Sequence, residues 1–122
     1  MAKKKSKSQT GPDAWRSIAI TYPGTETVPS CNKTAFKARK KSFLFLGELD
    51  GRYNIMVRLG DSRFEAEAMA EKDPDLVSVG PHWVTAEFAS KYKFPAGLVA
   101  RWIDESFRLV APKKLIAELD GA

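Results

Sequence analysis

The chain has 122 residues, 43% hydrophobic and 29% charged, a composition typical of a single soluble folded domain. It contains one cysteine and one histidine, which excludes an intramolecular disulfide and a structural zinc site built from this chain alone. Twenty lysines and arginines against fifteen acids give a formal net charge of +5, so polyanions such as nucleic acids are candidate partners.

The positive charge is concentrated in two short segments. Four cations lie among the first ten residues, which hold no acid: Lys3, Lys4, Lys5 and Lys7. Five more lie between Glu26 and Glu48, a stretch that also lacks acids: Lys33, Lys37, Arg39, Lys40 and Lys41. The remaining residues carry a formal charge of −4, so the body of the protein is mildly acidic. A polyanion responds to such local clusters more than to a diffuse charge, because salt screens charges beyond about 8 Å.

The N-terminal residues 1–12 are rich in lysine and serine, which predicts a disordered basic tail followed by a single domain over residues 13–122. The tail is either a sequence-independent tether to nucleic acid or a solubilising end. A secretory signal requires an apolar stretch after its positive charges, and no such stretch follows the charges of this segment. The longest apolar run, Phe43–Leu46, is far too short to span a bilayer. We therefore expect a cytoplasmic protein that does not associate with membranes.

The first half of the chain predicts one helix and three strands. Asp13 is a suitable N-cap for a short helix that ends before Tyr22-Pro23-Gly24. Residues 34–39 alternate as a half-buried strand, with Phe36 on one face and Lys37 on the other. Phe43–Leu46 is apolar on both faces and predicts a central strand. Asp50-Gly51 is a hairpin signal that joins it to an antiparallel strand over residues 53–59.

The second half predicts a helix, two strands and a long amphipathic helix. Residues 61–72 have helical spacing, and Pro74 ends that helix. Short strands follow over residues 76–79 and 84–88. A broad apolar stripe from Leu98 to Val110 indicates a helix, with a short helix over residues 113–119 after it. On the polar face of the long helix, two ion pairs at i,i+4 spacing are expected: Arg101 with Glu105, and Asp104 with Arg108.

The order α-β-β-β-α-β-β-α predicts an α+β fold in two layers, an antiparallel sheet with helices on one face. No internal repeat is visible.

Four segments carry a resemblance to a known family. They are residues 22–26 (YPGTE), residues 34–43 (TAFKARKKSF), residues 82–86 (HWVTA) and residues 103–113 (IDESFRLVAPK). In these segments the chain resembles the MmcQ/YjbR-like family, small bacterial proteins usually described as DNA-binding. The resemblance covers residues 13 to the end. It implies an α+β fold of the double-wing or secretion-chaperone-like type, also compared with frataxin-like proteins. The family often has glycine where Lys40 stands, and glycine accepts a positive φ that lysine resists.

The cations between Lys33 and Lys41 are the main candidate site. Lys33, Lys37, Arg39 and Lys41 share one strand parity, which spaces neighbouring positions by about 6.6–7 Å along a face. That spacing is close to the distance of about 7 Å between successive phosphates of a nucleic-acid strand. Two interpretations remain open: a strand that tracks phosphates, with Lys40 beside it, or an edge strand whose lysines prevent edge-to-edge pairing.

Other candidates are weaker. Trp83 lies on the polar face of its strand and could stack on a base, or could cover a sheet edge. The resemblance adds second-rank phosphate contacts: Arg101, Arg108, Lys113 and Lys114. No role is assigned to His82 or Cys31. The chain has no nucleophile motif, glycine-rich phosphate loop or metal-spaced cluster, so neither catalysis, nor a cofactor, nor a metal is predicted.

The sequence thus favours a non-catalytic protein that binds DNA without sequence preference, through phosphate contacts from a basic strand. The alternative is a protein-interaction module, because secretion-chaperone-like folds present a sheet face or helix to a partner chain.

Overall fold

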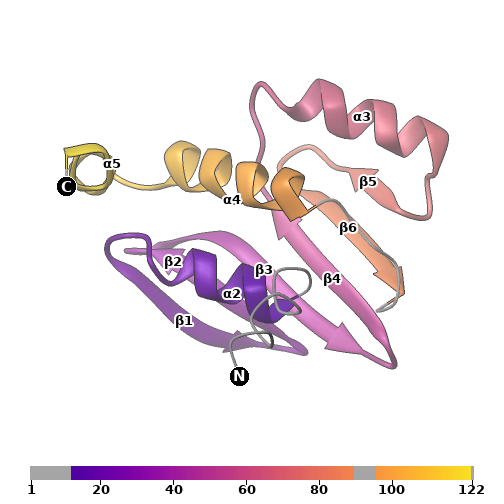
Figure 1. Ribbon diagram of the computed structural model, residues 1–122, viewed down its shortest axis with the longest axis horizontal. Helices are drawn as coiled ribbons and strands as arrows, with labels where there is room; N and C mark the ends of the chain where they lie inside the picture. Colours follow the sequence, from indigo (N-terminus) through magenta and orange to yellow (C-terminus); the bar gives the residue numbers. More distant parts are fainter. Residues whose placement is uncertain (1–11, 90–95, 122) are drawn as a thin grey trace.

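The computed structural model describes residues 12–89 and 96–121, which form an α+β domain (Figure 1). The predicted tail lies outside the described residues except for Pro12, which begins the first helix. In chain order the elements are α2 (Pro12–Ala19), β1 (Thr25–Ser30), β2 (Lys33–Ala38), β3 (Lys41–Leu49), β4 (Arg52–Val57), α3 (Arg63–Lys72), β5 (Val77–Val79), β6 (Val84–Ala89), α4 (Ala96–Val110) and α5 (Lys113–Gly121).

The strands form one six-stranded antiparallel sheet in the order β1-β2-β3-β4-β6-β5. The predicted fold class is confirmed, but the sheet has an additional strand, β1, that the sequence pattern did not indicate. The four middle residues of β1 are all exposed, so the strand has no apolar alternation to reveal it. Proline is unusual within strands, so Pro29 also gave no indication of one. It is tolerated here because β1 lies at the edge of the sheet.

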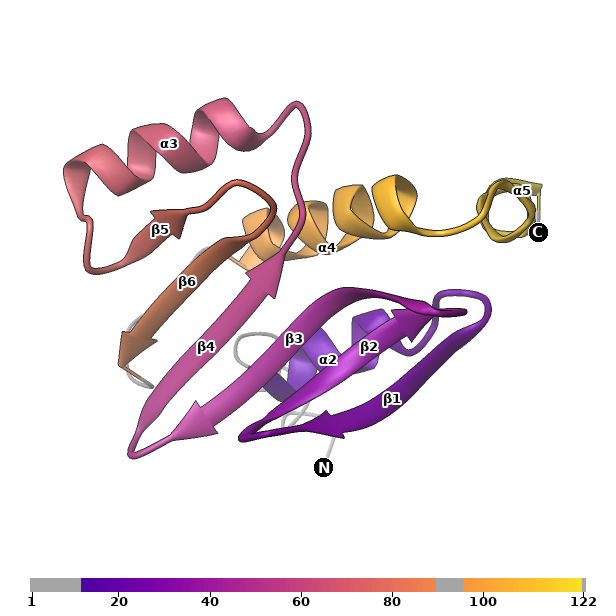
Figure 2. The same ribbon diagram turned by 180° about the vertical axis from the view of Figure 1, so that it is seen from behind.

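Helices α2 and α4 lie across one face of the sheet, and the other face is open (Figures 1 and 2). The covered face holds rows of buried side chains in register: Leu46, Ile55 and Ala86 form one row across β3, β4 and β6. The predicted stripe of α4 packs onto these rows and contributes Trp102 and Phe107, which are fully buried. Helix α3 packs against the edge strand β5 (Figure 2). No helix in the part of the chain described is long and apolar enough to cross a membrane.

A β-bulge explains why the central strand is apolar on both faces. Leu44 pairs with Phe36 and Ser42 pairs with Lys37, which leaves Phe43 as an extra residue in β3. The ring of Phe43 turns toward α4, where its centroid lies 5.1 Å from that of Phe107. The bulge therefore places two consecutive β3 side chains, Phe43 and Leu44, in the core.

Ser106 connects α4 to the sheet beside this bulge. The side chain is fully buried, and its hydroxyl donates to the carbonyl oxygen of Phe43 at 2.5 Å. The Ser106 Oγ in turn accepts from the backbone N–H of Arg58 at 2.9 Å. One side chain thus satisfies two backbone groups, one near the start of β3 and one just after the end of β4.

A chain of polar contacts joins the loop after α2 to α4 and α5. The Tyr22 hydroxyl donates to Asp104 at 2.8 Å, and the Nε of Arg108 donates to the other oxygen of Asp104 at 2.8 Å. Arg108 also forms a bidentate pair with Asp120 of α5 at 2.8 and 3.0 Å. Burial raises the pKa of the Tyr22 hydroxyl, and the hydrogen bond to Asp104 raises it further. The predicted pair between Asp104 and Arg108 is confirmed.

The other predicted pair on α4 is wrong. Glu105 does not pair with Arg101; its carboxylate accepts from the N–H groups of Gly60 and Ser62 at 2.6 and 3.0 Å and from the Ser62 hydroxyl at 2.6 Å. Arg101 pairs instead with Glu65 of α3 at 3.2 Å. Both acids of this region thus link α4 to the start of α3, because tertiary neighbours outcompete the exposed i,i+4 contact.

Candidate nucleic-acid interface

The sequence predicted that the basic residues between Lys33 and Lys41 share one strand face. In the structure they do not. Strand β2 ends at Ala38, which pairs with Lys41, the first residue of β3. Arg39 and Lys40 form the two-residue turn between these strands. The regular parity needed for a row of phosphate contacts is therefore broken after Lys37, and the cations form the tip of a β-hairpin.

The geometry of the turn differs from the family expectation in one residue. Arg39 has a φ of 67°, whereas Lys40, where the family often has glycine, is not among the residues with positive φ. The left-handed conformation that favours glycine thus falls one position earlier, on an arginine. A turn in a run of basic residues carries no glycine, asparagine or aspartate signal, which is why the strand was predicted to continue.

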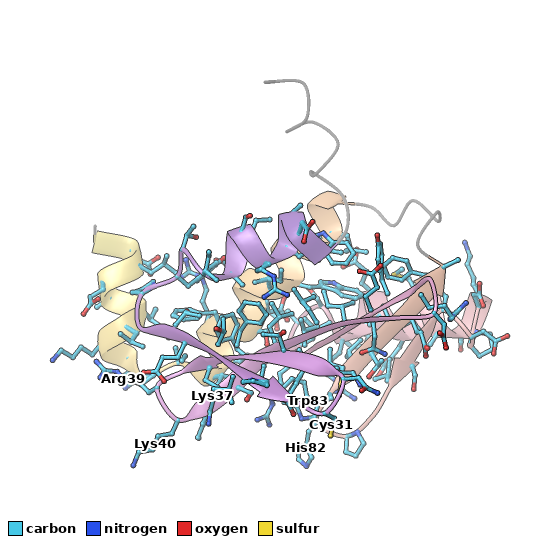
Figure 3. The ribbon with its side chains drawn as sticks, turned by 90° about the horizontal axis from the view of Figure 1, so that it is seen from below. Cys31, Lys37, Arg39, Lys40, His82 and Trp83 are labelled. Atoms are coloured by element: carbon cyan, nitrogen blue, oxygen red, sulfur yellow. The ribbon has the colours of Figure 1, made fainter. Side chains whose placement is uncertain are left out.

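The hairpin tip projects beyond β4, and its turn, Arg39 and Lys40, also extends past the last pair between β1 and β2, Thr25 with Ala38. Strand β3 pairs with β4 only from Leu44 onward, whereas its pairing with β2 continues to Lys41. Arg39, Lys40 and Lys41 are exposed, and none of them forms an ion pair among the residues described. In Figure 3, Arg39 and Lys40 lie at one extremity of the molecule, and Lys40 points away from α2. We call Arg39, Lys40 and Lys41 the hairpin tip.

The two lysines of β2 have different surroundings. Lys37 lies on the open face near the tip, and its register partner in β1 is Glu26. Lys33 begins the strand about 13 Å away, at four residues of about 3.3 Å each. It lines a depression of about 240 Å³ at the opposite end of the sheet, which has mixed charge because its other lining residues include Glu48, Asp50, Arg52 and Glu87. Lys33 is therefore separate from the hairpin tip.

Three residues distant in sequence join Lys41 at a cleft beside the tip. Arg58 follows β4, Arg63 begins α3 and His82 precedes β6. Together with Lys41 they line a cleft of about 330 Å³, whose remaining walls are Leu59, Pro81, Leu109 and Val110. The sequence predicted a strand at Arg58 and a helix at Arg63, and assigned neither residue to a site. Their convergence depends on the antiparallel order of β3, β4 and β6, which no local pattern reveals.

Trp83 is half-buried on the open face and already has two partners. Its ring lies 5.2 Å from that of Phe45 in an edge contact, and the guanidinium of Arg58 lies 5.6 Å from its centroid. One face of the indole is therefore occupied by a cation. Base stacking on Trp83 stays a prediction.

The second-rank cations are divided between paired and free groups. Arg101 and Arg108 are held in the ion pairs described above, and hydrogen bonds to Asp120 and Asp104 raise the pKa of Arg108. Lys113 and Lys114 begin α5 and are exposed. Cys31 is exposed in the turn between β1 and β2, with a φ of 56°. In residues 12–89 and 96–121, no three histidine, cysteine or acidic side chains are grouped as metal ligands.

Comparison with known proteins supports the resemblance. A crystal structure of the Deinococcus radiodurans protein DR2400, described as a DUF419 domain, matches with a TM-score of 0.63 over 84% of this chain and 79% of that chain. At 18% identity, this match establishes a shared fold. No curated protein matches. The family model described as YjbR matches residues 20–109, which include the hairpin tip, every residue that lines the cleft except Val110, and most of α4. The chain therefore belongs to the YjbR family.

Proposed function

We propose that this YjbR family member is a non-catalytic, cytoplasmic protein that binds DNA without sequence preference, through phosphate contacts from the hairpin tip. The observation that carries the proposal is the exposure of Arg39, Lys40 and Lys41 at a projecting turn, without ion pairs among the described residues. Cations whose charge is not neutralised internally can displace the counterions that surround a DNA duplex.

The position of the tip supports contact with the phosphates at the rim of a groove. Strand β1 pairs with β2 as far as Ala38, so the turn residues Arg39 and Lys40 extend beyond three paired strands. An exposed basic turn can contact phosphates without inserting a strand into the groove. The formal charge of −4 on the body favours an orientation in which the tip approaches the duplex first.

The test compares two variants that each remove two charges. Arg39→Gln with Lys40→Gln removes two cations from the tip, and the control Lys33→Gln with Lys72→Gln removes two exposed or half-exposed cations elsewhere. Binding to a random duplex is measured by fluorescence anisotropy at several salt concentrations. We expect the tip variant to reduce the slope of log K against log salt by roughly two units, at about 0.9 per phosphate contact, and the control to change it little.

Two outcomes would contradict the proposal. Equal slopes for the tip variant and the control would mean that the tip is not the contact surface. Absence of binding at low salt would exclude DNA altogether. A third variant, with Lys3, Lys4, Lys5 and Lys7 changed to glutamine, separates the fold from the N-terminal segment. If only this variant loses binding, the hairpin tip is not the binder.

One observation favours the alternative, a protein-interaction module. A row of side chains in register crosses the open face, and it includes Val28, Ala35, Phe45 and Met56 on β1 to β4. Val28 is 39% exposed. Such a row could receive the apolar side chains of a partner chain. Met56→Lys would then abolish capture of a partner and leave the salt dependence of DNA binding unchanged.

A further inference from the structure

We infer that the cleft beside the hairpin tip binds a phosphate monoester, the terminal phosphate of a small molecule or of a nucleic-acid end. The cleft brings together Lys41, Arg58, Arg63 and His82, and none of the residues that line it is acidic. The cleft shares Lys41 with the hairpin tip, but it can be tested separately from duplex binding, because it is a concave site for a different ionic form of phosphate.

The two arginines of the cleft are held in place by the protein. The Arg58 guanidinium lies over the indole of Trp83, and the backbone N–H of Arg58 is fixed by Ser106. The Nη2 of Arg63 donates to the carbonyl oxygen of Gly80 at 3.0 Å. Each guanidinium keeps further N–H donors, so the site is already ordered before an anion enters, which reduces the entropic cost of binding.

A carboxylate close to the cleft is already engaged. Glu105 lies near Gly60, which follows the lining residue Leu59; a Cβ added at Gly60 would lie 3.8 Å from the Oε2 of Glu105 and 3.6 Å from the Cδ1 of Leu109. Its oxygens accept from Gly60 and Ser62, which offsets part of its charge. Asp61 is exposed next to these residues but does not line the cleft. The cations therefore outnumber the acids around the cleft.

The size and charge of the cleft favour a terminal phosphate over an internal one. A phosphate monoester carries about −1.5 to −2 charges at neutral pH, whereas a phosphodiester carries one. Three permanent cations match the monoester better. A volume of about 330 Å³ holds a phosphate with a small attached group but does not admit a continuous duplex. The attached group would contact Leu59, Pro81 and Leu109, of which Leu109 is 54% exposed at the rim.

The first experiment measures binding of phenyl phosphate by isothermal titration calorimetry and by NMR shifts of the backbone amides. We expect Lys41→Gln with His82→Gln to weaken binding about tenfold or more, because charge-assisted hydrogen bonds are lost. The matched control is Lys72→Gln, which removes an exposed cation at the end of α3 that does not line the cleft and should leave the affinity unchanged. Arg63→Gln, with folding checked by circular dichroism, should weaken binding similarly.

The second experiment distinguishes the two sources of the phosphate. A single-stranded oligonucleotide with a 5′-phosphate is compared with the same strand bearing a 5′-hydroxyl. Tighter binding of the phosphorylated strand, lost in the Lys41 and His82 variant, indicates a nucleic-acid end; phenyl phosphate binding alone indicates a small molecule. If phenyl phosphate does not bind the wild type, or binds it and the variant equally, the inference is overturned. Duplex binding by the wild type could still be observed if the cleft does not bind phenyl phosphate. Conversely, a failure to bind duplex DNA would not contradict phosphate binding in the cleft.

Discussion

At the scale of single residues, Arg39 has a backbone conformation that carries a cost in stability. Its φ of 67° lies in the left-handed region, where a side chain other than glycine or asparagine costs about 1 kcal/mol or more. The side chain is exposed and forms no ion pair among the residues described, so no ion pair there offsets this cost. A cation is thus retained where the backbone favours glycine.

Arg39→Gly should therefore separate stability from binding. We expect the free energy of unfolding to rise by about 0.5 kcal/mol, since relief of strain exceeds the entropic cost of glycine. At the same time the salt slope for duplex binding should fall by about one unit. Urea denaturation and anisotropy on the same preparation measure both quantities. A loss of stability larger than about 1 kcal/mol would show that Arg39 has a structural role.

At the scale of elements, one buried hydroxyl adds hydrogen bonds to the apolar packing that attaches α4 to the sheet. Ser106 bonds to both Phe43 and Arg58, which belong to the ends of β3 and β4 that carry the tip and the cleft. The positions of Lys41 and Arg58 relative to one another therefore depend on α4.

Ser106→Ala should destabilise the protein by about 2 to 3 kcal/mol, because a buried carbonyl and a partly buried N–H both lose their partner. Urea denaturation measures this change. The control is Ser17→Ala, which removes a hydroxyl that donates to Asp13 on an exposed helix and should cost less than about 0.5 kcal/mol. Similar effects for the two serines would contradict the role assigned to Ser106.

The molecule as a whole is held by carboxylates that connect its helices. Hydrogen bonds from Arg101 lower the pKa of Glu65, and Arg108 lowers that of Asp120. Burial alone would raise the pKa of Glu105, but hydrogen bonds from Ser62 and Gly60 lower it overall. A carboxyl whose pKa is lower in the folded state stabilises that state above the pKa of the unfolded chain. This stability is lost as the pH falls through the folded value.

We therefore expect the free energy of unfolding to decrease as the pH falls below about 4.5, the ordinary glutamate value, through 3.8, that of aspartate. Glu105→Gln should lower stability at pH 7 by about 1 kcal/mol and have progressively less effect as the pH falls through the lowered pKa of the wild-type carboxyl. Denaturation at a series of pH values tests this difference. An equal cost at every pH would mean that the charge of Glu105 is not what stabilises the start of α3.

Features set by neighbouring residues in the sequence could be predicted, whereas features set by contacts between distant residues could not. Alternation and turn signals predicted the strands around Phe36 and Ile55 and the Asp50-Gly51 turn, where both residues have positive φ. They missed β1, whose exposed side chains have no pattern, and the turn at Arg39, which lacks turn residues. The sequence did not predict that Arg58 and His82 line one cleft with Lys41, because their proximity depends on the strand order across the whole sheet.

The projection of the hairpin beyond β4 also has an evolutionary consequence. Arg39 and Lys40 contribute nothing to the core, so replacing them changes the surface potential without creating cavities or unsatisfied groups. Mutations at such positions are nearly neutral for folding and are filtered mainly by what the surface binds. On this scaffold the binding preference can therefore drift or be redesigned at the tip while selection on stability acts elsewhere.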